Sequence, residues 1–187
     1  MFTMLRTTLA LAMAASSTAC LASDPVVAEF RGPGNGLAGS AGTNNKFGQS
    51  FTAETTADIG TIELSMRRNG ASPVNLLVTI FETNSQGLPT GSPLGSATLP
   101  VTLTTEYEWY SIDFSQQPVA VSDGTRYAIT VSSDPGDGGY LLQTATNNPY
   151  ADGSGLVYLA GGPWELMADN FIYGIRDVLF AVLPAAS

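Results

Sequence analysis

The sequence has no histidine and a single cysteine, and only 12% of its 187 residues are charged. Without histidine, the chain lacks the usual general base of serine and cysteine hydrolases and the commonest zinc ligand. No nucleophile elbow, phosphate-binding loop or dinucleotide fingerprint leads from a strand into a helix. The 16 Asp and Glu against 7 Lys and Arg disfavour nucleic acids and anionic membranes as partners. Paired carboxylates remain the one plausible catalytic class, and we expect the protein not to be an enzyme.

The first 22 residues resemble a secretory signal peptide. Arg6 precedes an apolar run from Leu9 to Ala15, and Cys20-Leu21-Ala22 fits a small-x-Ala cleavage pattern. This apolar run is too short to span a membrane. We therefore expect a mature chain that begins near Ser23, folds as one domain over residues 23–187, and is periplasmic or extracellular.

Whether the mature protein retains Cys20 distinguishes a released form from a lipid-anchored form. Cleavage after Ala22 leaves the mature chain without cysteine, which excludes disulfides and thiol chemistry. The alternative is a lipoprotein that is cut before Cys20 and lipidated there. Such signals normally carry Leu or a similar aliphatic residue three positions upstream, where this chain has Ser17. The sequence therefore favours the released form.

Alternation of apolar and polar residues with period two predicts an all-β fold. The first strand has one face formed by Phe47, Gln49 and Phe51. The second has one face formed by Ile62, Leu64 and Met66, and the third has one formed by Leu76, Val78 and Ile80. The predicted strands are 47–53, 59–68, 74–82, 94–101, 107–114, 125–132, 139–144, 156–160 and 171–182. About nine or ten strands separated by turns such as Asn69-Gly70 predict one antiparallel β-sandwich of jelly-roll type. The Gly- and Asn-rich segment 32–45 is predicted to be an exposed loop.

Calcium is the most plausible inorganic partner, because it is bound by carboxylate and carbonyl oxygens. Asp134 and Asp137 place two carboxylates on one Gly-rich turn. No complete EF-hand pattern is present, and Asp-Gly turns are also common without a metal. The sequence therefore predicts no certain cofactor, with a structural calcium ion as the candidate.

Aromatic residues on a sheet or loop can hold sugars, because the C–H face of a pyranose stacks on an aromatic ring. The candidates are Tyr107, Trp109, Tyr140, Tyr150, Tyr158 and Trp164, each of which could instead pack in or beside the core. The segment NNPYADGSGLVYLAGGPW (147–164) favours Trp164, Tyr150 and Asn148, because functional residues concentrate in loops. We predict a ligand site with these three residues and Trp109.

Six motifs occur in an order that resembles the secreted bacterial jelly-roll modules called choice-of-anchor domains. They are GQSFTA (48–53), GLPTGSPLGSATL (87–99), WYSIDF (109–114), VAVSDGTRYAITVS (119–132), NNPYADGSGLVYLAGGPW (147–164) and DNFIYGI (169–175). The resemblance covers roughly residues 47–182. It implies a sandwich akin to carbohydrate-binding modules, at the cell surface or in the extracellular matrix, and it carries no established catalytic activity.

Three functions follow as hypotheses. The first is a secreted, non-catalytic module that binds a glycan or another extracellular polymer. The second is a structural or adhesive surface protein without a dedicated small-ligand site. The third, disfavoured, is a glycoside-active enzyme, which requires two of Glu63, Glu82, Glu108 and Asp113 within about 5–10 Å of each other.

Overall fold

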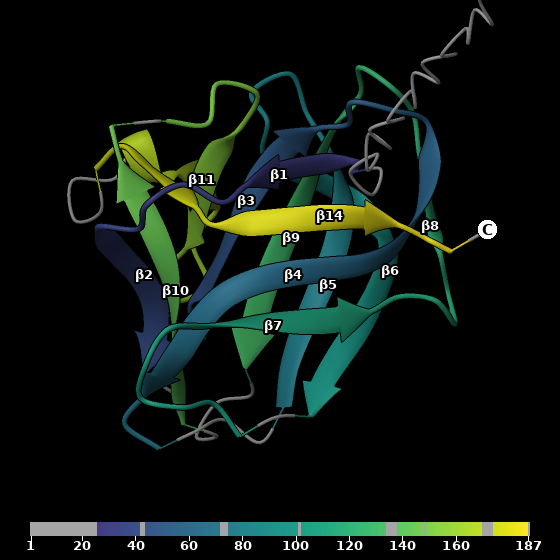
Figure 1. Cartoon of the computed structure of the whole chain (residues 1–187). Coiled ribbons are helices and arrows are strands. Elements are labelled where there is room, and N and C mark those ends of the chain that lie inside the picture. The colour runs from purple at the N-terminus through teal and green to yellow at the C-terminus, as the bar shows by residue number, and fades with distance from the viewer. Residues whose placement is uncertain are drawn as a thin grey trace, which may run out of the picture.

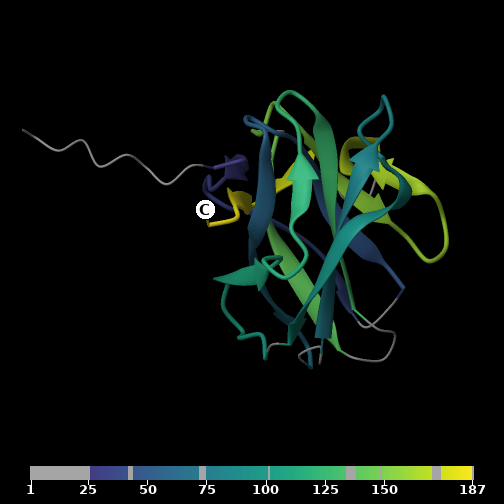
Figure 2. The same ribbon diagram turned by 90° about the vertical axis from the view of Figure 1, so that its right-hand side faces the viewer.

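The computed structural model describes residues 26–41, 44–71, 75–100, 102–133, 138–147, 149–169 and 174–186. These residues form two antiparallel sheets that lie face to face, so that β1, β14, β4 and β7 cover β3, β9, β5 and β6 in Figure 1. Figure 2 shows the same two layers from the side. The predicted fold class, an all-β sandwich of two antiparallel sheets, is confirmed.

One sheet has eight strands and the other six. The eight-stranded sheet contains β1 (Ala28–Phe30), β2 (Gly36–Ala41), β4 (Ala57–Asn69), β7 (Glu108–Asp113), β8 (Val119–Val121), β10 (Gly139–Thr146), β13 (Arg176–Val178) and β14 (Phe180–Pro184). The six-stranded sheet follows the order β12 (Trp164–Leu166), β11 (Ser154–Tyr158), β3 (Lys46–Thr52), β9 (Arg126–Ser133), β5 (Asn75–Thr83) and β6 (Pro89–Pro100). A short 3-10 helix, η1 (Met167–Asp169), follows β12.

The core lies between the sheets and is built by the predicted alternation. Val157, Phe47, Val131 and Val78 occupy one register across β11, β3, β9 and β5, and each is completely buried. The phenol of Tyr140 on β10 donates a hydrogen bond to the Val131 carbonyl at 2.6 Å, which ties the two sheets together. Inward residues thus exclude water, and their sequence neighbours point to the outer faces.

A buried polar cluster joins β3 to β13 and to the segment after β10. The Gln49 Nε2 donates to Asp177 Oδ1 at 3.0 Å, and the Val178 N–H donates to Gln49 Oε1 at 2.8 Å. The Tyr150 N–H donates to the other oxygen of Asp177 at 3.1 Å. Burial raises the pKa of Asp177, although hydrogen bonds from Gln49, Tyr150 and Gly155 act in the opposite direction.

Three details of the sequence prediction were wrong or incomplete. The described residues form fourteen strands rather than nine or ten, because strands of three residues such as β1 and β8 are too short to show alternation. The segment 32–45 is not wholly a loop, since β2 lies within it and pairs with β10. Gly39 permits this pairing, because a Cβ there would lie 2.2 Å from the Tyr140 carbonyl oxygen. The last predicted strand is divided into β13 and β14 at Leu179, and residues 171–173 lie outside the described residues.

None of the helices formed by the described residues is long and apolar enough to cross a membrane. The predicted signal peptide and Cys20 lie outside the described residues and remain predictions.

Candidate ligand groove on the six-stranded sheet

Six side chains form one line across the outer face of the six-stranded sheet. β11 pairs Tyr158 with Trp164 of β12 on one side and with Lys46 of β3 on the other. β3 and β9 pair Phe47 with Val131, and this register puts Lys46 beside Ser132. We call this line the transverse row; it consists of Trp164, Tyr158, Lys46, Ser132, Leu77 and Thr98.

The second half of the transverse row lies on β9, β5 and β6. β5 pairs Leu77 with Ser132 of β9 and with Thr98 of β6. Five residues of the row directly adjoin an inward residue in sequence, and Trp164 takes the same side through its pairing with Tyr158, so the row faces away from the core. Leu77 is 43% exposed, so its side chain offers an apolar surface to solvent on this face.

The aromatic end of the row is a contiguous stack. The rings of Tyr158 and Trp164 lie 5.5 Å apart at 52°, and the Lys46 ammonium lies 5.4 Å from the centre of the Tyr158 ring. Contacts of both kinds are attractive, because the ring faces carry negative charge density. The three side chains therefore support one another in a fixed arrangement.

A tight turn between β11 and β12 brings Trp164 back beside Tyr158. Ala160 and Gly161 both have positive φ, at 42° and 88°, and the Gly162 N–H donates to the Leu159 carbonyl at 2.8 Å. The side chain of Asn45, which immediately precedes β3, accepts a hydrogen bond from the Ala160 N–H at 3.0 Å. The glycines predicted as turn residues thus serve the hairpin that positions the aromatic pair.

Two hollows lie along the transverse row on either side of Leu77. The larger, about 440 Å³, is lined by Asn44, Asn45, Lys46, Leu77, Ser132, Ser133, Tyr158, Ala160 and Gly161. The smaller, about 310 Å³, is lined by Asn75, Leu77, Thr98, Ser132 and Ser133. Since the hollows share three lining residues, we treat them together as one groove, which we call the row groove. Its described lining combines an aromatic ring, an aliphatic side chain, amides, hydroxyls and one ammonium group, and contains no carboxylate.

Trp164 borders a third hollow beside the row groove. This hollow, about 360 Å³, is lined by Gln86, Leu88, Trp164, Glu165, Leu166 and Asp169. The side chain of Trp164 is half-buried and lines this third hollow, and its ring contacts that of Tyr158, which lines the row groove. The predicted ligand residue Trp164 thus lies at a concave surface, which is where ligand sites occur.

The structure does not support Tyr150 as a ligand contact. Tyr150 is only 6% exposed, and its ring packs edge-to-face on Phe180 at 5.1 Å and lies 6.3 Å from Phe30. Burial also raises the pKa of its phenol. Tyr150 lies outside the strands, but its ring fills the core, so the prediction from its location in a loop was wrong.

Trp109 is exposed, but it lies on the opposite side of the sandwich from Trp164. It pairs with Ser65 on β4 in the eight-stranded sheet, and the guanidinium of Arg31 lies 4.7 Å from the centre of its ring. The structure therefore separates the two tryptophans that the sequence placed in one candidate site. A small ligand cannot contact both.

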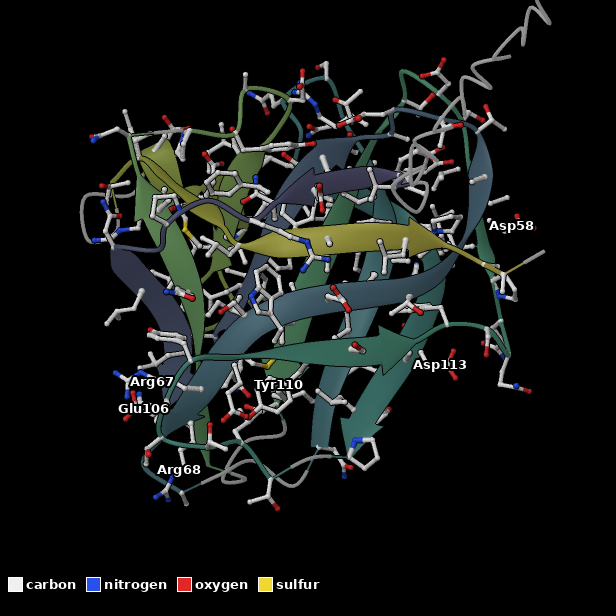
Figure 3. The ribbon with its side chains drawn as sticks, in the orientation of Figure 1. Asp58, Arg67, Arg68, Glu106, Tyr110 and Asp113 are labelled. Carbon is white, nitrogen blue, oxygen red and sulfur yellow. The ribbon has the colours of Figure 1, made fainter. Side chains whose placement is uncertain are left out.

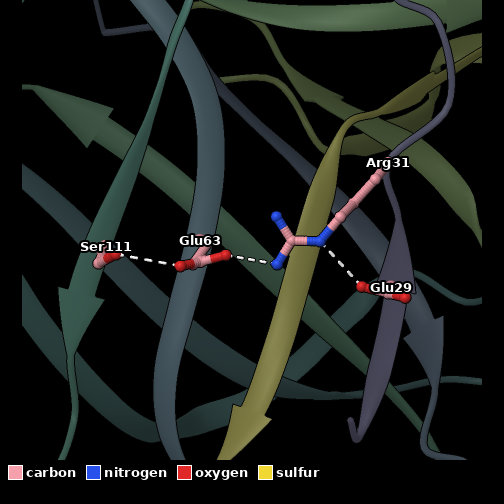
Figure 4. A network of polar contacts seen from close by, with 4 residues as sticks. All are labelled: Glu29, Arg31, Glu63 and Ser111. Carbon is pink, nitrogen blue, oxygen red and sulfur yellow. Dashed lines mark hydrogen bonds and ion pairs between the residues drawn. The ribbon is translucent and has the colours of Figure 1, made fainter. Parts of the chain in front are cut away.

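Arg31 is held over Trp109 by a network of ion pairs shown in Figure 4. It donates to Glu29 at 2.9 Å and to Glu63, whose carboxylate also accepts a hydrogen bond from Ser111. Partial burial acts to lower the pKa of Arg31, but hydrogen bonds and charge attraction from Glu63 and Glu29 outweigh it and raise the pKa. The network fastens the chain after β1 to the eight-stranded sheet.

The four carboxylates of the enzyme hypothesis are divided between the two sheets. Two of them are near in register, because Asp113 lies two residues from Ser111, the β7 partner of Glu63. Glu82 is on the six-stranded sheet, whereas Glu63, Glu108 and Asp113 are on the eight-stranded sheet. In Figure 3, Asp113 lies near the C-terminal end of β7, far from Glu106, which precedes that strand. Hydrogen bonds from Ser115 lower the pKa of Asp113, whereas a general acid needs a raised pKa.

Three predicted site residues cannot be placed. Asn148, Asp134 and Asp137 lie outside the described residues. Within the part of the chain that the structure describes, no three His, Cys, Asp or Glu side chains are grouped as a metal site requires. The calcium site thus remains a prediction from the sequence.

No family model and no curated protein matches the chain. Among solved structures it is similar to a clostridial cysteine protease, Cwp84, after propeptide cleavage, with a TM-score of 0.52 and 14% identity over 80% of this chain and 37% of that chain. Another similar structure contains the cysteine protease and lectin-like domains of Cwp84, a surface layer associated protein of Clostridium difficile, with a TM-score of 0.48 and 13% identity over 74% and 32% of the two chains. The chain thus spans about a third of the length of these proteins. At this identity, the first likeness shows a shared fold alone.

Four residues of the transverse row were not predicted as site residues. They come from strands that are adjacent in the sheet, and they are Lys46, Ser132, Leu77 and Thr98. The predicted alternation already placed Leu77 on the outer face of its strand. A leucine that points away from the core was the one sequence feature that could have indicated this part of the site. The neighbours of Leu77 depend on strand order, which the alternation does not reveal.

Proposed function

We propose that this protein is a secreted, non-catalytic binding module that holds a glycan in the row groove. The observation that carries the proposal is the stack of Tyr158 and Trp164 at one end of the transverse row. The two half-exposed rings are tilted by 52° to each other, and each offers its own apolar face to the C–H face of a pyranose. An exposed Leu77 farther along the row adds a second apolar contact.

The polar lining supports the same ligand class. Asn44, Asn45 and Ser132 bring amides and a hydroxyl to the groove, and Lys46 brings an ammonium group. Sugars present several hydroxyls that both donate and accept hydrogen bonds, so they need groups of both kinds. A lining without carboxylates among the described residues also favours binding over glycoside hydrolysis, which needs two of them.

The proposed location is extracellular or periplasmic, released from the membrane. It is supported by the signal-peptide pattern of residues 1–22, including the small-x-Ala sequence that ends at Ala22. Anchoring through Cys20 is the alternative. Mass spectrometry of the mature N-terminus separates the two, because only the anchored form retains Cys20 with its lipid.

Affinity electrophoresis against a panel of soluble plant, fungal and bacterial polysaccharides tests the function. We expect Trp164→Ala to weaken retention of the bound polysaccharide about tenfold or more, which corresponds to about 1.4 kcal/mol. Trp109→Ala is the matched control, because it removes an exposed tryptophan from the other face. Retention that Trp164→Ala leaves unchanged, or that Trp109→Ala weakens instead, contradicts the proposed site.

The same assay distinguishes the adhesive alternative. A structural surface protein without a dedicated ligand site shows no retention by any polysaccharide and no difference between the two variants. Such a result overturns the proposed glycan function.

A further inference from the structure

We infer that the row groove binds an internal segment of a linear polysaccharide that lies across the strands, rather than a chain end or a single sugar. This inference rests on the proposed function. It concerns the length and direction of the ligand, which follow from the order of the strands.

The transverse row crosses all six strands of its sheet at one register. Neighbouring strands are roughly 4.8 Å apart, so the five steps from Trp164 to Thr98 span roughly 24 Å. The rings of an extended pyranose chain follow one another at a spacing comparable to that between strands. The row therefore offers about one side chain to each successive ring.

The chemistry along the row favours several rings over one. Tyr158 and Leu77, the two apolar surfaces of the groove, are three strands apart, or roughly 14 Å. Lys46 and Ser132 lie between them and can bond hydroxyls. A monosaccharide on Tyr158 cannot reach Leu77, so only a longer ligand uses both apolar contacts.

Both ends of the row lie at edges of the sheet. β12 and β6 are the first and last strands in the order of the six-stranded sheet, and Thr98 on β6 is exposed. A ligand that lies along the row can extend past either edge strand. Recognition of a chain end would need a wall at one end, and among the described residues neither edge strand has a further strand of its sheet beyond it.

The test is a length series measured by isothermal titration calorimetry. The probes are gluco-, xylo- and N-acetylglucosamine oligosaccharides with β-1,4 or β-1,3 links, from disaccharide to hexasaccharide, with free and with chemically reduced ends. For any series that binds, we expect affinity to rise from disaccharide to about pentasaccharide and then to level off. Reduced ends are expected to leave affinity unchanged.

Two variants test the direction of the ligand. Leu77→Ala is expected to weaken pentasaccharide binding roughly fivefold and to leave disaccharide binding unchanged, because a disaccharide on the aromatic pair does not reach Leu77. Trp164→Ala is expected to weaken binding at every length. Circular dichroism melting curves verify that both variants fold, and Leu77 is suited to this test because it is half-exposed.

The outcomes separate the two proposals. An affinity that is already maximal for a disaccharide, or that reduction of the chain end abolishes, overturns the internal-chain inference and leaves the glycan function standing. An equal effect of Leu77→Ala at every length also overturns it. If no oligosaccharide and no polysaccharide binds, the proposed function itself fails.

Discussion

The ring of Trp164 lies 5.5 Å from that of Tyr158 because β11 and β12 pair these two residues directly across a five-residue connection. The pairing fixes both rings on the outer face of the six-stranded sheet, beside Lys46. Rings held in this way lose little conformational freedom when a ligand stacks on them, which favours binding. The pair is therefore the structural basis of the proposed function.

Tyr158→Ala is expected to weaken glycan binding about tenfold, whereas Tyr158→Phe keeps it within about twofold, because the stacking surface is the ring and not the phenol. The chain has only two tryptophans, so Trp164 can be observed alone in a Trp109→Phe background. Ligand titration should then change the Trp164 fluorescence. Equal affinities for the Ala and Phe variants would show that the ring of Tyr158 does not contact the ligand.

Lys46→Met is expected to weaken glycan binding about two- to tenfold, the equivalent of one lost hydrogen bond of about 0.5–1.5 kcal/mol. Methionine keeps an apolar chain beside Tyr158 but removes the donor. Lys46→Arg retains both the charge and the donors and serves as the control. Calorimetry with the polysaccharide retained in the electrophoresis panel measures all three proteins, and an unaffected Met variant would remove Lys46 from the binding site.

Asp177→Asn is expected to destabilise the fold by about 1.5–3 kcal/mol at pH 7, because an amide cannot accept from both Gln49 and the Tyr150 N–H as the carboxylate does. Urea denaturation monitored by circular dichroism measures the loss. Asp113→Asn is the control, since Asp113 is exposed on the edge of the other sheet.

The pH dependence of the stability of wild type and Asp177→Asn tests the direction of the pKa shift of Asp177. Burial raises the pKa of Asp177 above the unfolded value of about 3.9, so between these two values the folded protein binds more protons than the unfolded chain. The proton-linked part of the Asp177 contribution, which is separate from the hydrogen bonds lost in Asp177→Asn at pH 7, is therefore present below the unfolded pKa and falls as pH rises through the folded pKa. Acidification from pH 7 should widen the stability difference between wild type and Asp177→Asn. A difference that narrows would mean that the hydrogen bonds outweigh burial.

If calcium binds to Asp134 and Asp137 on the turn predicted from the sequence, Ca²⁺ is expected to raise the melting temperature of the protein, and a chelator is expected to reverse the rise. The variant Asp134→Asn, Asp137→Asn should abolish the response by removing both carboxylates. Differential scanning calorimetry measures the melting temperature, and Mg²⁺ serves as the control ion. Identical melting curves in Ca²⁺ and in chelator would contradict the hypothesis.

The local pattern of the sequence predicted the fold class because alternation depends only on each strand and on the core it faces. The inward residues of β3, β4 and β5, such as Phe47, Ile62 and Val78, are buried as expected. At Asn69-Gly70 the prediction held only for the backbone: Gly70 has the expected positive φ of +78°, but the flanking strands β4 and β5 belong to different sheets, so the predicted hairpin turn was wrong. Short strands and β2 escaped prediction because their backbone pairing depends on a partner that is remote in the sequence.

The candidate site was predicted in part. Trp164 was chosen for its place in a loop-rich segment and does lie at a concave surface, but the same reasoning chose Tyr150, which packs in the core. The two residues differ in what lies next to them in space. Phe180 of β14 covers Tyr150, whereas Tyr158 flanks Trp164 at the surface.

By itself, then, the sequence determined a β-sandwich with alternating faces, a secretory type of N-terminus as a prediction, and the absence of histidine-dependent chemistry. Only the tertiary structure decided which outward residues become neighbours. Strand order placed Leu77 and Ser132 in line with Lys46 and Tyr158, and it put Trp109 and Trp164 on opposite sides of the molecule. The physical reason is that side-chain alternation is a property of each strand, whereas a binding surface depends on long-range backbone pairing between strands.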